Sequence, residues 1–120
     1  MTNTTVRQVT FLDNPFTFET FQRILENDDL FPIDETLFYF NDEPEPEQCH
    51  YLGCIRGYDK PYWVGYCDVL DGCEFSTAAE LLNAKIYCGH SIREKWEHLV
   101  FETIGGIGTE DWLANYSDKI

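Results

Sequence analysis

The spacing of apolar side chains predicts a helix near the N-terminus. Asn14 precedes Pro15, and this pair suits a helix start because proline fits the first helical position while asparagine caps free amide groups. Apolar side chains then recur at helical spacing on one face: Phe18, Phe21, Ile24 and Leu25. Residues 6–12 alternate loosely between apolar and polar side chains, so a strand is expected before this helix.

Apolar runs in the middle of the chain predict a sheet. Residues 36–40 (TLFYF) are too uniformly apolar for a half-exposed strand, so we expect a central strand that is buried on both faces. Residues 49–56 and 62–69 flank the turn residues GYDKP and predict a β-hairpin. Gly53 and Gly65 lie inside these two strands, where glycine is typical of a bulge or of the close approach of another group, such as an aromatic ring.

Capping motifs predict helices in the last third of the chain. The segments 77–80 (TAAE) and 91–94 (SIRE) both match the capping box, in which two side chains satisfy amide groups reciprocally. The first helix is expected to end near Gly89 and to bury Ala78, Leu81, Leu82 and Ile86. The second is expected to stop at Gly105 and Gly106 and to present Ile92, Trp96, Leu99, Val100 and Ile104 on one face. A last short helix is expected to be capped by Thr109 and to carry Trp112, Leu113 and Tyr116.

Together these elements predict one α+β domain over residues 1–120. We expect a small, mostly antiparallel sheet of about four strands, packed against N-terminal and C-terminal helices. Residues 1–5 are expected to be a flexible N-terminus, and residues 41–48 (NDEPEPEQ) an acidic Pro-Glu loop, because proline fits neither a helix nor an interior strand. Hydrophobic residues make up 43% of the chain and aromatic residues 16%, which is enough apolar material for a packed core.

The net charge narrows the classes of partner. The chain carries 22 acidic and 8 basic residues, a formal charge of −14, which argues against nucleic acid and anionic membranes as ligands because both require basic surface. No apolar stretch is long enough to span a bilayer, and residues 1–5 lack the features of a secretory signal. We therefore expect a cytoplasmic protein with reduced thiols at Cys49, Cys54, Cys67, Cys73 and Cys88.

Carboxylates are concentrated in one part of the sequence. No Lys or Arg occurs between Arg23 and Arg56, and the acids in this interval bracket the predicted strand 36–40, so they are expected near both of its ends. Such a field attracts a basic partner, and exposed aromatic side chains of the hairpin are typical binding anchors. The predicted partner-binding residues are Asp28, Asp29, Asp34, Glu35, Asp42, Glu43, Glu45, Glu47, Tyr62 and Trp63. The alternative is that the acids form solvated loops and the rings pack in the core.

Cysteine and histidine residues are candidates for metal ligands and for a nucleophile. Structural zinc sites have closely paired ligands, whereas four residues separate Cys49 from Cys54 and strand alternation turns these two side chains to opposite faces. Cys88 and His90 precede a predicted helix start, yet the acidic surroundings oppose a reactive thiolate. No calcium-loop or phosphate-binding pattern is present. We expect no catalytic residues, no metal and no cofactor.

The leading hypothesis is a non-catalytic acidic binding protein, of the inhibitor or antitoxin and immunity type, that occludes a basic protein partner. That partner could be a nuclease, another nucleic-acid-binding enzyme or a toxin. The alternative is a small-molecule or metal-binding regulatory module with a pocket between sheet and helices. An enzyme that uses Cys88 and His90 is the third hypothesis.

Overall fold

The computed structural model describes residues 14–43, 49–65 and 73–120. The predicted strand 6–12, the flexible residues 1–5, most of the acidic loop and the end of the second hairpin strand therefore lie outside the described residues. The three described ranges form three α-helices and two short 3₁₀ turns, at Trp96–His98 and Ser117–Lys119. The helices are α1 (Phe18–Glu26), α2 (Ala78–Asn83) and α3 (Thr109–Tyr116).

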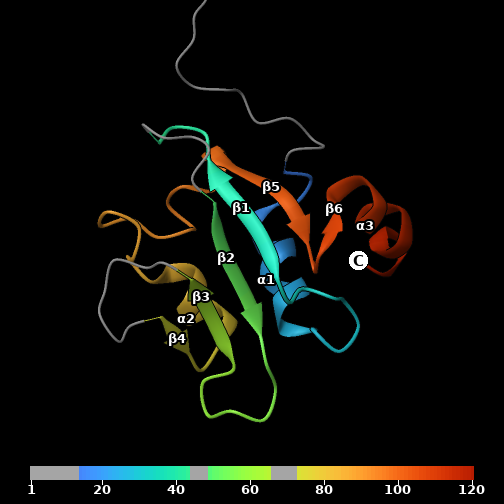
Figure 1. The fold of residues 1–120 in the computed structure, drawn as a ribbon, viewed down its shortest axis with the longest axis horizontal. Coiled ribbons are helices and arrows are strands. Elements are labelled where there is room, and N and C mark those ends of the chain that lie inside the picture. The colour runs from blue at the N-terminus through green and yellow to red at the C-terminus, as the bar shows by residue number, and fades with distance from the viewer. Residues whose placement is uncertain (1–13, 44–48, 66–72) are drawn as a thin grey trace, which may run out of the picture.

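Within the described residues, one antiparallel sheet holds six strands in the order β4-β3-β2-β1-β5-β6 (Figure 1). The strands are β1 (Thr36–Phe40), β2 (His50–Cys54), β3 (Tyr62–Gly65), β4 (Glu74–Phe75), β5 (Leu99–Ile104) and β6 (Ile107–Gly108). The α+β prediction is confirmed, and so are the strand at 36–40 and the hairpin of β2 and β3. The prediction of about four strands is too low, because β4, β5 and β6 were not predicted as strands.

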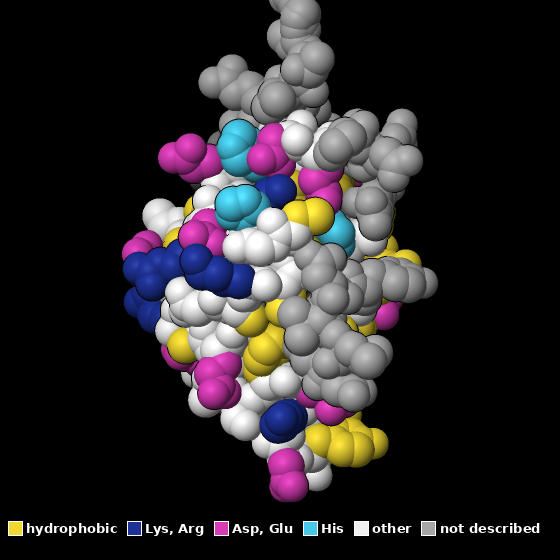
Figure 2. Space-filling view, turned by 90° about the vertical axis from the view of Figure 1, so that its left-hand side faces the viewer, with side chains coloured by type: hydrophobic (Ala, Val, Ile, Leu, Met, Phe, Trp, Pro, Cys, Tyr) yellow, Lys and Arg dark blue, Asp and Glu magenta, His cyan; other side chains and the backbone are white. Residues whose placement is uncertain are grey.

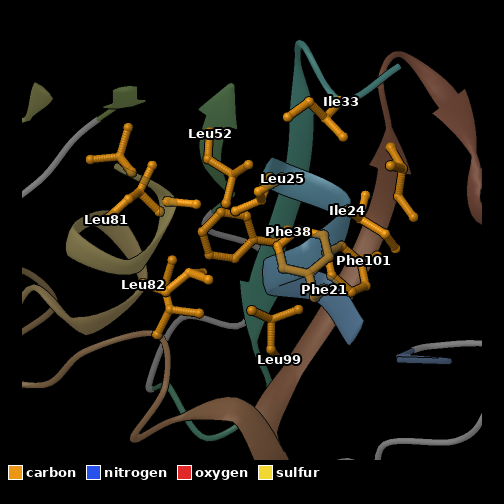
Figure 3. Close-up of a cluster of buried hydrophobic side chains, with 14 of the residues drawn as sticks. Phe21, Ile24, Leu25, Ile33, Phe38, Leu52, Leu81, Leu82, Leu99 and Phe101 are labelled. Carbon is orange, nitrogen blue, oxygen red and sulfur yellow. The ribbon is translucent and has the colours of Figure 1, made fainter. Parts of the chain in front are cut away.

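Strand alternation and the helices place the core on one face of the sheet (Figure 3). Phe38 and Leu52 point from neighbouring strands toward α1 and α2, whose apolar side chains cover them. Side chains of this core include Phe21, Ile24, Leu25, Phe38, Phe40, Leu52, Leu81, Leu82, Leu99 and Phe101. α3 packs instead beside β5 and β6 at one edge of the sheet (Figure 1).

The first helix starts later than the sequence predicts. Thr17 caps α1 by accepting a hydrogen bond from the amide of Thr20 at 3.1 Å. Asn14 instead donates its side-chain amide to the carbonyl of Trp96 at 3.3 Å, which holds the entering chain against a distant segment. Phe18 therefore opens the helix, and the predicted apolar face of Phe21, Ile24 and Leu25 is buried.

The predicted long helix from Ser91 to Ile104 is wrong. Ser91 and Glu94 do form the reciprocal hydrogen bonds of the capping box, at 2.9 and 3.0 Å, and the bond from the Ser91 amide lowers the pKa of Glu94. Only a turn and the 3₁₀ segment follow, and residues 99–104 (LVFETI) then pair with β1 as β5. The apolar positions that match helical spacing here serve a strand, whose β-branched and aromatic side chains fit a pleated sheet.

The two glycines after β5 belong to a hairpin and do not end a helix. Gly105 and Gly106 have φ values of +59° and +79° and connect β5 to β6. Positive φ at both central residues is what a type I′ hairpin turn requires. This pair therefore reverses the chain and adds an edge strand to the sheet.

Two smaller capping predictions are also corrected. α2 has the predicted capping box at Thr77 and Glu80, but it ends at Asn83, and Gly89 lies in a separate turn between Tyr87 and His90. α3 is present where a helix was predicted, yet its N-cap is Gly108. Thr109 donates its hydroxyl to the carbonyl of Phe101 at 3.4 Å and ties the helix to β5.

None of the helices in the described part of the chain has the length and apolar character needed to cross a membrane.

Candidate functional site

The predicted partner-binding acids fall into two groups at opposite ends of β1. Asp28, Asp29, Asp34 and Glu35 precede the strand, whereas Asp42 and Glu43 follow it. A five-residue strand spans about 13 Å at ~3.3 Å per residue, so the two groups form separate surfaces. Glu45 and Glu47 lie outside the described residues.

The group after β1 is engaged with cationic and histidine side chains of the same chain. Asp42 lies 3.3 Å from the Lys95 ammonium and 3.9 Å from Nε2 of His98. Nε2 of the buried His50 lies 3.1 Å from the Glu43 carboxylate. These contacts link the end of β1 to β2 and to the segment before β5, so Asp42 and Glu43 hold neighbouring segments of the same chain together.

In the group before β1, Asp28 is a structural contact point. Its carboxylate accepts hydrogen bonds from the Arg56 guanidinium, with Nε at 2.8 Å. Burial, followed by the charge of Asp28, raises the pKa of Cys54 to about 11. Asp28 therefore fastens the loop between α1 and β1 to the β2–β3 hairpin.

The two predicted aromatic anchors have different environments. Tyr62 is only 4% exposed and donates its hydroxyl to the carbonyl of Leu25 at 3.0 Å, so it is a core residue that cannot contact a partner directly. Trp63 points to the other face of β3, is half-buried, and donates its indole N–H to Asp34 at 2.9 Å. The period of two along the strand separates these neighbours.

Glycine makes room for the Trp63–Asp34 contact. Gly53 lies directly opposite Trp63 in the register of β2 and β3. A Cβ atom at Gly53 would overlap the Asp34 carboxylate and lie 2.7 Å from Nε1 of Trp63. Gly65 likewise lies opposite Tyr51, whose ring would be 2.6 Å from an added Cβ. The expected close approach of aromatic rings to both glycines is confirmed.

Replacing Gly53 with alanine is expected to displace both Asp34 and Trp63. The new methyl group requires the indole and the carboxylate to move, which should lower the free energy of unfolding by about 1–3 kcal/mol. Denaturant unfolding measures this loss, and the indole N–H resonance of Trp63 should shift in the NMR spectrum.

Gly108→Ala is the matched control, because nothing lies within 4 Å of its added Cβ. We expect it to cost less than about 1 kcal/mol and to leave the Trp63 resonance in place. Equal effects of the two substitutions would contradict the packing described for Gly53.

A pocket of about 280 Å³ lies on the outer side of the hairpin, next to Trp63. Unlike the core side chains, two of the side chains that line it are accessible to solvent: Tyr58 is 68% exposed and Ile55 is 47% exposed. We call this feature the hairpin pocket, and it is lined by Ile55, Tyr58, Lys60, Pro61, Trp63 and Glu74. Figure 2 shows hydrophobic, acidic and basic side chains together at the lower end of the molecule, where the hairpin lies.

Several carboxylates at this end of the sheet have no partner within the described residues. Hydrogen bonds from Arg56 to Asp28 and from Trp63 to Asp34 bring the loop before β1 up to the hairpin. The acids with no side-chain hydrogen bond or ion pair there are Asp29, Glu35, Asp59 and Glu74, and all four are exposed. We call these four acids and the hairpin pocket the hairpin-end surface.

Sequence reasoning missed most of this pocket. Tyr58, Lys60 and Pro61 belong to the predicted turn 57–61 and Ile55 to the end of the predicted strand 49–56, and none of the four is among the predicted partner-binding residues. Tyr58 was the residue that could have indicated this surface, because a large aromatic side chain in a short polar turn has no core to pack into and is left exposed. Glu74 could not be assigned, since only the pairing of β4 with β3 brings it beside Trp63.

The cysteine and histidine residues do not converge on one centre. No cluster of three or more His, Cys, Asp or Glu side chains in the described ranges is placed to hold a metal ion. Cys54 is buried, Cys49 is half-buried with a pKa raised by burial, and Cys88 lies exposed in the turn that leads to His90. Cys73 is disulfide-bonded, which corrects the expectation that every thiol is reduced. Cys67 lies outside the described residues.

No protein-family model, curated protein sequence or solved structure matches this chain.

Proposed function

We propose that this chain is a non-catalytic binding protein that occludes a basic protein partner, as inhibitors and immunity proteins do. The binding face in this proposal is the hairpin-end surface. The observation that carries it is the combination of exposed, unpaired carboxylates with exposed apolar side chains at one end of the sheet. A nuclease, another nucleic-acid-binding enzyme or a toxin with a Lys- and Arg-lined active site has the complementary charge.

The charge of the whole molecule supports a basic partner. At −14 the chain attracts cationic proteins over distances limited by salt screening, which speeds their encounter. Asp29 and Glu35 are exposed on the loop that Asp28 and Asp34 fasten in place. A fixed loop loses little conformational freedom on binding, so its carboxylates are suited to recognise an equally fixed basic surface.

The apolar part of the surface supports binding with a buried centre. Tyr and Trp are enriched among residues that dominate interface energies, and charged residues commonly surround them as a polar rim. Tyr58 and Trp63 line the hairpin pocket together with Glu74, and Asp59 follows Tyr58 directly in the chain. In this proposal the rim sets the choice of partner and the rate of encounter, while the rings contribute the contact area.

Neutralising acids on this surface is expected to weaken binding of a basic probe. The double variant Asp29→Asn, Glu35→Gln should raise the Kd for a hexa-lysine amide peptide about three- to tenfold, because two rim charges are lost. NMR titration of the isotope-labelled chain gives the Kd and also locates the peptide. In the wild type, the Kd should rise about tenfold or more from about 20 to about 200 mM salt.

The double variant Glu19→Gln, Glu97→Gln makes the same change in charge elsewhere. Both side chains are exposed, and their chain neighbours Phe18 and Trp96 are in ring contact just before β5, whose first residue pairs with Phe40 at the far end of β1 from the hairpin. This double variant should change the Kd by less than about twofold. Equal weakening by both double variants, or peptide shifts spread over the whole surface, would show attraction by net charge alone and would remove the proposed site.

A further inference from the structure

We infer that the hairpin pocket receives a single arginine side chain of the basic partner. This inference rests on the proposed function and names the chemical group that the site recognises. It follows from the size of the pocket, from the aromatic and acidic side chains that line it, and from the position of its one cation.

The size of the pocket fits one side chain. Its volume of about 280 Å³ is below the roughly 300–1,000 Å³ that whole drug-sized ligands occupy. It also opens directly on the surface beside Tyr58 and Ile55, the most exposed apolar residues of the hairpin. A side chain that projects from another protein can enter such a pocket without any rearrangement of the strands.

The walls of the pocket match the two properties of a guanidinium group, its flat faces and its charge. Tyr58 and Trp63 supply aromatic surface, on which arginine stacks more readily than lysine because its cation is planar and more weakly hydrated. Glu74 lies directly opposite Trp63 in the register of β3 and β4, so both side chains point to the same face of the sheet. Its unpaired carboxylate can accept paired hydrogen bonds from the fork of arginine donors.

The indole of Trp63 is held in place before any partner arrives. Its N–H group is occupied by Asp34 at 2.9 Å, and Gly53 lies beneath both side chains. The ring is therefore available for stacking and not for donating a hydrogen bond to a ligand. This arrangement disfavours an anionic or carbonyl ligand that would need the indole N–H group.

Lys60 is the one cation of the pocket, and it makes no ion pair within the described residues. It repels an incoming guanidinium at the rim, whereas Glu74, Asp34 and the neighbouring Asp59 attract it. The lining itself carries one acid and one cation, and the two further carboxylates beside it, Asp34 at the Trp63 indole and Asp59 next to Lys60 in the chain, favour a cationic occupant. Removing the charge of Lys60 should therefore strengthen binding of arginine, and the same change should weaken binding of a carboxylate.

The test compares three probes on the full chain by NMR: hexa-arginine amide, hexa-lysine amide and hexa-glutamate amide. We expect hexa-arginine to bind about two- to fivefold more tightly than hexa-lysine, the scale of one exposed cation–π contact, and to shift the Trp63 indole resonance. Tyr58→Leu and Glu74→Gln should each weaken hexa-arginine binding about two- to fivefold, and Lys60→Gln should tighten it by a similar factor. Glu97→Gln is the matched control for Glu74→Gln and should leave the Kd within about twofold.

The outcomes separate this inference from the proposed function. If hexa-arginine and hexa-lysine bind equally and only Asp29→Asn, Glu35→Gln weakens them, the arginine pocket is wrong while the binding surface stands. If neither basic peptide binds at the hairpin end, the proposed function itself is wrong. Binding of hexa-glutamate that is lost in Lys60→Gln would overturn the cationic occupant.

Discussion

Replacing Trp112 with alanine is expected to lower the free energy of unfolding by about 3–5 kcal/mol, the largest effect of any single substitution considered for this chain. Its side chain is fully buried and packs against the rings of Phe16 and Phe31, each with a centroid 5.7 Å away. The indole N–H also donates to the carbonyl of Pro32 at 2.9 Å. Truncation leaves a cavity where α3 meets the loop before β1. Chemical denaturation followed by circular dichroism measures the loss.

Two controls separate the packing of Trp112 from its hydrogen bond and from a general effect of losing tryptophan. Trp112→Phe keeps a ring but leaves the Pro32 carbonyl unpaired, so it should cost about 1–3 kcal/mol. Trp63→Ala removes a half-buried indole and should cost less than Trp112→Ala. A loss below about 1.5 kcal/mol for Trp112→Ala would contradict the packing of α3 described here.

Raising the pH from about 8 to 11 is expected to destabilise the fold by up to about 2–3 kcal/mol through Cys54 alone. Burial and the neighbouring Asp28 raise the pKa of this thiol from 9.0 to about 11 in the folded chain. The thiol in the unfolded chain loses its proton near pH 9, while the folded chain retains it. The stabilisation is therefore complete below pH 9 and is lost between pH 9 and 11. Urea unfolding at closely spaced pH values measures how steeply the free energy of unfolding falls with pH.

Cys54→Ser isolates this contribution. A serine side chain is close in size to cysteine and can hydrogen-bond, but its hydroxyl does not ionise in this range. In the variant, the free energy of unfolding should fall with pH only through other groups, such as Tyr62, whose pKa is also raised chiefly by burial. A slope that is the same in the variant and the wild type would assign the pH dependence to groups other than Cys54.

Segments whose signals agree were predicted correctly from the sequence. β1 is uniformly apolar and lies at the centre of the sheet, where all of its residues except Leu37 are buried. The hairpin of β2 and β3 follows from two apolar runs around a turn, and Thr77 and Glu80 cap α2 as their spacing predicts. In each case the local preference and the tertiary environment favour the same conformation.

The predicted helix over 91–104 is wrong because its two local signals, a capping box and a pair of glycines, are also compatible with a strand and a hairpin turn. The Ser91–Glu94 capping box forms, but a cap stabilises only the first turn and does not propagate a helix. Val100, Phe101, Thr103 and Ile104 favour a strand, and β1 offers a free edge to pair with. Two adjacent glycines are as typical of a type I′ hairpin turn as of a helix end, and the pairing of β5 with β6 selects the turn.

The candidate site could be predicted only in part. The sequence identified acids on both sides of β1 and an aromatic hairpin, and Trp63 does lie at the hairpin-end surface. It did not show that Asp28 and Asp34 hold loops together, that Tyr62 lies in the core, or that Glu74 stands beside Trp63. These facts depend on which segments pair, and the charge of a residue carries no information about that.

By itself, the amino-acid sequence determined the fold class, the net charge and those elements whose apolar spacing and caps act over one or two turns. Such preferences are local, so they can be read without knowing what the rest of the chain does. Only the tertiary structure decided that residues 99–104 form a strand and which carboxylates remain unpaired at the surface. Both outcomes depend on contacts between residues far apart in the chain. The free energy of strand pairing and burial is several-fold larger than the local conformational preference of these residues.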